Sequence, residues 1–178
     1  MAAIILIGYR GVGKSAVASE IIKQLSENKF SAMKISLDDE LAVKLGNLQT
    51  FIKKNGWEAF RAEETDLLKK IKLSLQQCVI DCGGGIVENE ENIELLKKLG
   101  KIFYIRAEVK TIQQRMQTTH ARLSLSGNQS FFDEIKKVLE YRDPLYSKAA
   151  DVIIESDLMS IEECAEKILS NISWDFVR

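Results

Sequence analysis

The chain has 178 residues with a formal net charge of −1, and 46% of its residues are apolar. These values predict one globular domain over 1–178 and exclude an intrinsically disordered chain. A nearly neutral chain gives no electrostatic reason to expect nucleic acid or a membrane surface as a partner.

Short apolar runs alternate with helical patterns along the chain. The expected strands span residues 3–7, 32–37, 78–82, 102–106 and 152–155, and the expected helices span 14–26, 39–45, 48–54, 58–76, 89–99, 110–117, 131–149 and 161–171. Most of these strands are largely apolar, as strands covered on both faces are. The alternation predicts a three-layer α/β/α fold, with a five-stranded parallel sheet and helices on both faces. Ligands of such a sheet bind at the carboxyl ends of its strands.

Residues 8–15 form the pattern of a phosphate-binding P-loop. The segment matches G-x-x-x-x-G-K-S, follows the first expected strand and opens the first expected helix, which is the context that this motif requires. Its glycines let backbone N–H groups point at phosphate oxygens, and the start of the helix adds further donors. Lys14 is expected to reach the β- and γ-phosphates, and the Ser15 hydroxyl to ligate Mg²⁺. The motif therefore predicts a site for a nucleoside triphosphate.

Three consecutive acids, Asp38, Asp39 and Glu40, follow the second expected strand. Asp38 is a good helix N-cap, and two more acids in the first turn would favour that helix. A carboxylate at a strand end beside a P-loop also suits a kinase. Phosphoryl transfer needs one to hold Mg²⁺ and often one to accept the proton of the attacking hydroxyl. Both interpretations stay open at this point.

An acid and a run of glycines end the third expected strand. Asp81 follows three apolar residues, where an unpaired buried carboxylate is costly. It is either a Walker B-like acid near the metal or a carboxylate satisfied by backbone N–H groups or by Lys14. Gly83, Gly84 and Gly85 are enough for a tight turn, yet three in a row also remove side chains where a ligand approaches the backbone. A small-molecule site at this turn is the functional interpretation.

Three arginines elsewhere in the chain are weaker indicators of function than these motifs. Taken singly, Arg61, Arg122 and Arg142 are explained as solvated surface charges. Arg122 lies in a polar, serine-rich stretch between two expected helices, and we predict a mobile lid there at about 117–130. An arginine in such a lid can neutralise charge in the transition state. His120, in the same stretch, is expected to be exposed and non-catalytic.

The cysteines and the opening segment bear on location. The three cysteines, Cys78, Cys82 and Cys164, are odd in number and lack the spacing of a zinc site, so they are expected to be buried, reduced thiols. The opening segment has no basic region before its short apolar run, which predicts no signal peptide, and no stretch is long enough to span a membrane. We therefore expect a cytoplasmic protein.

Together these motifs resemble the shikimate kinase family of small P-loop kinases. The resemblance covers roughly residues 4–169, and the order of the motifs carries it: the P-loop, L-D-x-acid, G-x-x-x-F-R-x-x-E, G-G-G, a lid with arginine, and R-x-P-L-Y. It implies a P-loop kinase fold and ATP-dependent phosphorylation of the 3-hydroxyl of shikimate by a monomer, with ATP and Mg²⁺ as cofactors.

The resemblance also implies roles by position. Asp38 matches a metal-associated aspartate, and Glu40 falls where the family has an aspartate that binds the shikimate hydroxyls and acts as base. Arg61 and Arg142 match the arginines that hold the shikimate carboxylate, a task that suits a planar guanidinium. Glu64 matches an acid that positions the first of these arginines.

Four groups of residues follow from these matches. The expected ATP-binding residues are Gly11, Val12, Gly13, Lys14, Ser15, Ala16, Arg115, which packs on adenine, and Arg122, which reaches the phosphates. The expected acceptor-binding residues are Asp38, Glu40, Arg61, Gly83, Gly84, Gly85 and Arg142. The expected metal ligands are Ser15, Asp38 and Asp81, and the expected catalytic residues are Lys14, Glu40 and Arg122.

The chain departs from the family pattern at three places. Glu40 is one methylene longer than the usual aspartate, and a misplacement of about 1 Å can cost on the order of a hundredfold in rate. Asp81 stands where a small hydroxyl or apolar residue is frequent, which adds a carboxylate near Mg²⁺. Leu123 follows the lid arginine where the family usually has proline, which loosens the backbone.

Two other functions compete with this interpretation. One is a related kinase for another polyol acid such as gluconate, which the Glu40 change favours slightly. The other is a weakly active nucleotide-binding protein with a regulatory role, against which the intact Lys14, Ser15 and Asp38 argue. The C-terminal segment 174–178 carries two aromatic residues that either dock on the core or contact a partner.

Overall fold

The computed structural model of the protein describes residues 3–71, 78–119 and 128–172. A five-stranded sheet forms its centre, and every neighbouring pair of strands is parallel. Its strands are β1 (Ala3–Ile7), β2 (Met33–Ser36), β3 (Cys78–Asp81), β4 (Gly100–Arg106) and β5 (Val152–Glu155), in the spatial order β2-β3-β1-β4-β5. The five predicted strands and the predicted parallel sheet are confirmed.

The helices follow the predicted alternation with two differences. They are α1 (Lys14–Glu27), α2 (Leu37–Leu45), α3 (Leu48–Lys70), the short 3₁₀ helix η1 (Ile86–Glu88), α4 (Glu90–Leu99), α5 (Val109–Thr119), α6 (Asn128–Ala149) and α7 (Ile161–Ser170). The two helices expected over 48–54 and 58–76 are the parts of α3 on either side of a kink at Gly56, whose φ is 86°. Glycine adopts that φ without steric cost. The sequence pattern did not predict η1.

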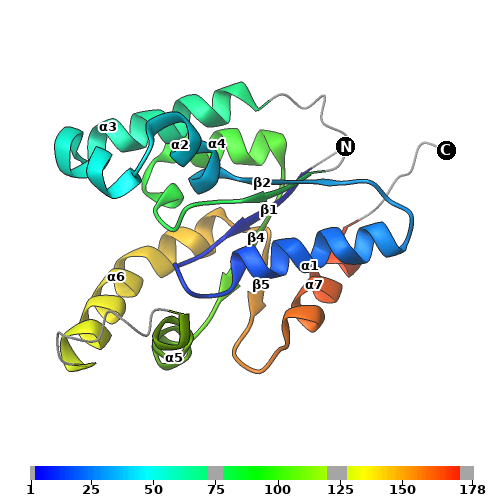
Figure 1. The fold of residues 1–178 in the computed structure, drawn as a ribbon. Coiled ribbons are helices and arrows are strands. Elements are labelled where there is room, and N and C mark those ends of the chain that lie inside the picture. Colours follow the sequence, from blue (N-terminus) through cyan, green and yellow to red (C-terminus); the bar gives the residue numbers. More distant parts are fainter. Residues whose placement is uncertain (1–2, 72–77, 120–127, 173–178) are drawn as a thin grey trace.

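The helices cover both faces of the sheet and complete the three predicted layers (Figure 1). Successive residues of β1 point to opposite faces. Ile4 and Leu6 pack in one hydrophobic cluster with residues of α1 and α7. Ile5 and Ile7 pack in a second cluster with residues of α3, α4 and α6. A strand that is buried on both sides must be apolar throughout, and this explains the continuous apolar run of β1.

The strand order determines where the site lies. The chain leaves β1, passes β3 to form the edge strand β2, returns to β3, and then crosses to β4 on the other side of β1. The connections on the two sides of β1 therefore diverge, and ligands of parallel sheets bind at such a switch point. The P-loop follows β1, and the triple-glycine turn follows its neighbour β3.

Several sequence predictions concern segments that the structure does not describe. Most of the expected lid at 117–130, including His120 and Arg122, and the aromatic C-terminal segment lie outside the described residues. The three cysteines do lie within them, and they are free and buried as predicted. Over the ranges that are described, no helix has the length and apolarity to cross a membrane.

Candidate functional site

The P-loop turns back on itself between β1 and α1. Gly11 and Gly13 have φ values of 81° and 103°, which residues with a side chain rarely adopt. A Cβ atom on Gly11 would also lie 2.6 Å from Cγ of Met116 in α5. The loop thus depends on glycine both for its backbone conformation and for the close approach of α5.

Lys14 is buried at the start of α1, with 8% of its surface exposed. Its Nζ donates to the carbonyl oxygens of Gly8 and Tyr9 at 2.9 and 3.1 Å. An ammonium group has three donors, so one N–H remains for a phosphate oxygen. Burial lowers the pKa of Lys14, while the nearby carboxylates of Asp81 and Asp38 act in the opposite direction.

Ser15 and Asp81 form a pair between α1 and the end of β3. The Ser15 hydroxyl donates to Oδ2 of Asp81 at 2.5 Å, and Asp81 is only 6% exposed. Asp81 is therefore satisfied mainly by the serine that is expected to ligate Mg²⁺. No group of three or more His, Cys, Asp or Glu side chains suited to a metal ion exists within the described residues. Mg²⁺ is usually bound by one or two carboxylates together with substrate phosphates, and this pair fits that pattern.

The three adjacent acids after β2 have different surroundings in the structure. Ser36, not Asp38, caps α2, because its hydroxyl accepts from the Asp39 backbone N–H at 3.3 Å. Asp38 lies in the first turn, and its Oδ1 would be 2.7 Å from a Cβ atom on Gly83. Glu40 is exposed and makes no hydrogen bond or ion pair with the residues that the structure describes.

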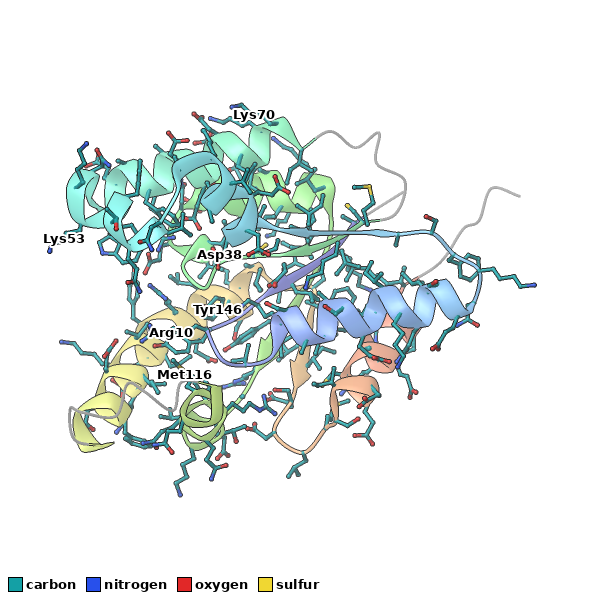
Figure 2. The ribbon with its side chains drawn as sticks, viewed as in Figure 1. Arg10, Asp38, Lys53, Lys70, Met116 and Tyr146 are labelled. Carbon is teal, nitrogen blue, oxygen red and sulfur yellow. The ribbon has the colours of Figure 1, made fainter. Side chains whose placement is uncertain are left out.

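The carboxyl group of Asp38 faces the other charged groups of the site. Burial of this carboxyl raises the pKa of Asp38, although the residue taken as a whole is exposed. The charge of Lys14 lowers the same pKa, and the charge of Asp81 raises it further. Asp38 and Tyr146 both lie toward the end of the sheet where β1 enters the P-loop (Figure 2).

The triple-glycine turn after β3 leaves room for charged side chains. A Cβ atom on Gly85 would lie 1.8 Å from Nη2 of Arg61, and one on Gly83 would crowd the carboxylates of Asp38 and Glu64. The backbone carbonyl of Gly84 accepts hydrogen bonds from two side chains of α6. Close packing of charged side chains therefore explains Gly83 and Gly85, whereas a Cβ atom on Gly84 would lie 3.3 Å from the backbone nitrogen of Arg10 in the P-loop.

Arg61 projects from α3 toward this turn. Its Nη1 donates to Oε2 of Glu64 at 2.5 Å, and Glu64 is 1% exposed. The other carboxylate oxygen of Glu64 is buried and has no partner among the described residues. The guanidinium also lies over the ring of Trp57, 5.4 Å from its centroid. Glu64 thus holds Arg61 in place, which is the role that the family resemblance implies for it.

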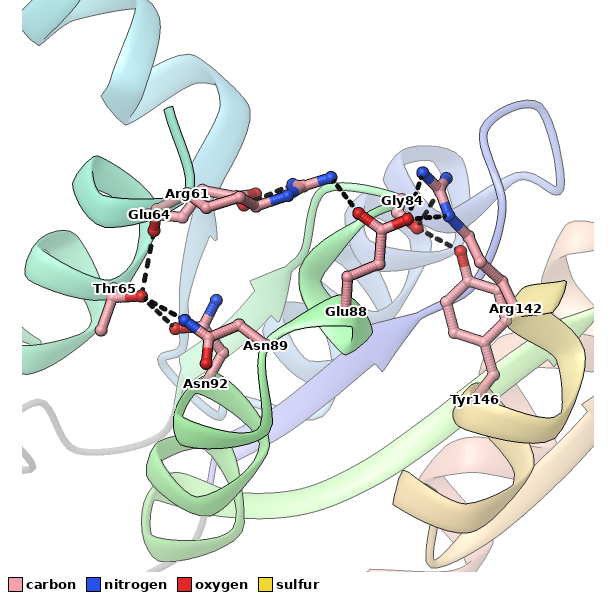
Figure 3. Close-up of polar contacts among 9 residues, drawn as sticks. All are labelled: Arg61, Glu64, Thr65, Gly84, Glu88, Asn89, Asn92, Arg142 and Tyr146. Carbon is pink, nitrogen blue, oxygen red and sulfur yellow. Dashed lines mark hydrogen bonds and ion pairs between the residues drawn. The ribbon is translucent and has the colours of Figure 1, made fainter. Parts of the chain in front are cut away.

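Arg142 reaches the same turn from α6, and Glu88 of η1 connects the two arginines (Figure 3). Oε2 of Glu88 accepts from Nη2 of Arg61 at 2.8 Å, and its Oε1 accepts from Nε of Arg142 at 2.9 Å. Arg142 also donates to the Gly84 carbonyl at 3.3 Å, and the Tyr146 hydroxyl donates to the same oxygen. The two arginines that were predicted from distant segments therefore meet.

Arg115 of α5 joins the P-loop to the segment after β5. Its guanidinium donates to the carbonyl of Val12 at 2.8 Å and to the carbonyl of Ser156 at 2.8 Å. The side chain therefore lies beside the nucleotide loop. Its predicted packing on adenine stays a prediction.

The comparison with known proteins agrees with this geometry. The family model described as "Shikimate kinase" matches residues 10–173. A shikimate kinase of Leptospira biflexa is 34% identical over 93% of each chain, and one of Thermodesulfovibrio yellowstonii is 36% identical over 93% of this chain and 92% of its own. The chain belongs to the shikimate kinase family. A structure of the Acinetobacter baumannii shikimate kinase in complex with shikimate superposes with a TM-score of 0.81, at 28% identity over 96% of this chain and 92% of its own.

In this member of the shikimate kinase family, two polar residues of the site escaped prediction from sequence. Glu88 lies three residues after the triple glycine, in a helix of one turn that no periodicity marks. Tyr146 stood within the quoted R-x-P-L-Y motif, but nothing in the sequence gave its hydroxyl a partner. Both partners come from segments far away in the chain, so only the fold could reveal them.

Proposed function

We propose that this protein catalyses the ATP-dependent phosphorylation of the 3-hydroxyl of shikimate to shikimate 3-phosphate. We propose further that it does so in the cytoplasm, as a monomer built from one domain. Membership of the shikimate kinase family and the buried, free cysteines support the activity and the location respectively. The same family membership implies ATP as the phosphoryl donor.

One arrangement carries the proposal. The P-loop with Lys14 follows β1, the pair of arginines lies at the glycine turn after the neighbouring strand β3, and Asp38 is within electrostatic reach of both Lys14 and Arg61. Two converging guanidinium groups suit an acceptor that carries a carboxylate, because each can bind it with paired hydrogen bonds. An acidic acceptor held at the arginines would present its hydroxyl toward the γ-phosphate held by Lys14.

Within this proposal, Asp38 is the group that accepts the proton of the attacking hydroxyl. Its carboxylate lies against Gly83 and within electrostatic reach of Lys14, whereas Glu40 has no polar contact with the residues that the structure describes. The hydroxyl oxygen then forms the new bond to the γ-phosphorus as the bond to the β-phosphate oxygen breaks. The free N–H of Lys14 stabilises the negative charge that is transferred. Arg122 of the predicted lid remains the candidate for a second such cation.

Mg²⁺ would be held by Ser15 and Asp81, with Asp38 nearby. All three donors are oxygen atoms, which Mg²⁺ prefers, and Asp81 lies at the end of β3 where a P-loop enzyme has its acidic metal partner. When bound, Mg²⁺ supplies charge neutralisation to the β- and γ-phosphates.

An assay of ADP release with shikimate, with gluconate and without acceptor tests this function. We expect release that depends on shikimate and not on gluconate. Release with gluconate alone would favour a kinase for another polyol acid. Nucleotide binding without release in any of the three reactions would favour the regulatory alternative.

A further inference from the structure

The two arginines of the acceptor site are already joined by a carboxylate of the protein. Glu88 gives one oxygen to each of them, at 2.8 Å to Arg61 and at 2.8 to 2.9 Å to Arg142 (Figure 3). The exposed fractions of the three side chains are 17% for Arg61, 19% for Arg142 and 28% for Glu88. These contacts are thus largely shielded from solvent, unlike ordinary surface ion pairs.

The charges at this position are balanced without any acceptor. Arg61 pairs with Glu64 as well as Glu88, so two guanidinium groups face two carboxylates when all four are ionised. An acidic acceptor that entered beside these groups would add a third negative charge. The acceptor can form ion pairs with both arginines only if it displaces one of the two protein carboxylates.

Of these two carboxylates, Glu88 is the one that can leave. Glu64 is 1% exposed and is fixed within α3 beneath Arg61. Glu88 is the last residue of the one-turn helix η1, and its side chain is partly open to solvent. A glutamate has three rotatable side-chain bonds, so its carboxylate can turn outward while the backbone of η1 stays in place.

We propose that Glu88 is a specificity-determining residue that occupies the carboxylate subsite until the acceptor displaces it. This proposal rests on the proposed function. The exchange replaces one carboxylate by another, so the net charge at the arginines is unchanged. The observed affinity for the acceptor is then the intrinsic affinity reduced by the fraction of molecules in which Glu88 has left. An acceptor without a carboxylate cannot replace the contacts that Glu88 gives up, so Glu88 stays on the arginines and that acceptor gains no affinity from them.

The test is direct binding of shikimate without nucleotide, measured by calorimetry for wild type, Glu88→Gln and Glu88→Ala. We expect both variants to bind shikimate about 3- to 30-fold more tightly, as expected when a competing, partly shielded ion pair is removed. An analogue in which hydrogen replaces the carboxylate of shikimate leaves the position between the arginines to Glu88, and its affinity should change by less than about twofold. The matched control is Glu91→Gln, because Glu91 pairs with Lys69 and touches neither arginine.

Each outcome decides the matter. Unchanged or weaker shikimate binding in both Glu88 variants would overturn the proposal, since Glu88 would then only hold the arginines in position. Equal gains for shikimate and the analogue without a carboxylate, or the same gain in Glu91→Gln, would also overturn it. In kinetics, the expected signature is a lower KM for shikimate with kcat nearly unchanged. Absence of shikimate-dependent ADP release in wild type and in Glu88→Gln would instead contradict the proposed function.

Discussion

At the scale of single residues, the acids after β2 have different surroundings in spite of their adjacency. Asp38 lies against Gly83 and senses the charges of Lys14 and Asp81, while Glu40 extends into solvent. The family resemblance had assigned the base to Glu40 by its position in the L-D-x-acid motif. Spacing along a helix turn cannot say which acid the neighbouring strand will meet, because β3 is formed by residues some forty positions later.

Paired substitutions separate the two acids. We expect Asp38→Asn to lower kcat by at least about a hundredfold, because it removes the proton acceptor. Glu40→Gln should change kcat and the KM for shikimate by less than about threefold, since solvent already surrounds that side chain. Steady-state kinetics of both variants measure this. A large loss in Glu40→Gln with an active Asp38→Asn would return the base to Glu40.

The pH dependence of the reaction follows from the environment of Asp38. Burial raises the pKa of this carboxyl above its ordinary 3.8. A base works only when deprotonated, so kcat/KM should fall as the pH decreases through the raised value, and activity should be lost at a higher pH than an ordinary aspartate would allow. A pH profile checks this, with nucleotide binding as the control for unfolding in acid. If kcat/KM fell only at or below pH 3.8, the result would contradict the assignment of Asp38 as the base.

At the scale of elements, the turn after β3 organises the acceptor side of the site. Gly85 has a φ of −103°, which alanine adopts without strain. A Cβ atom there would nevertheless lie 1.8 Å from Nη2 of Arg61. Because the end of a long side chain can move, Gly85→Ala should leave the fold intact and displace the guanidinium.

We therefore expect Gly85→Ala to raise the KM for shikimate by about tenfold or more, while the KM for ATP changes less than about threefold. Kinetics with each substrate varied in turn provide the measurement. Equal increases for both substrates would mean that the turn supports the P-loop rather than the acceptor arginine.

The elements also show what sequence could and could not predict. Apolar runs and the P-loop marked the strands and α1 to within a few residues, because burial on both faces of a sheet leaves a plain signature in composition. Two helices were predicted where the structure has the single helix α3, which is kinked at Gly56. The glycine within the helical pattern was the sequence signal for this kink. Glu88 gave no signal, since a single acid in a one-turn helix matches no period and its partners lie 27 and 54 residues away.

At the scale of the whole molecule, the site is assembled from both halves of the chain around β1. Bound nucleotide should therefore stabilise the entire fold. Saturation with ADP and Mg²⁺ at about 100 times Kd adds about 2.7 kcal/mol to the free energy of unfolding. For a chain of this length, that shifts Tm upward by about 5 to 10 °C.

Lys14→Met should abolish most of this shift, because the buried ammonium is the cation that we propose contacts the phosphates. Lys136→Met, which removes an exposed lysine of α6, is the control and should keep the shift. Thermal unfolding followed by circular dichroism supplies the comparison. Equal shifts in the two variants would show that the nucleotide binds elsewhere.

The aromatic ring over Arg61 gives the protein an optical reporter. Trp57 is 60% exposed and its indole lies 5.4 Å from the guanidinium that Glu88 holds. The chain has two tryptophans, so Trp174→Phe leaves Trp57 as the single emitter. When the acceptor carboxylate replaces Glu88 on Arg61, the electric field at the indole of Trp57 changes, and so should its fluorescence. Rapid-mixing fluorescence can thus time the arrival of the acceptor separately from the transfer of phosphate.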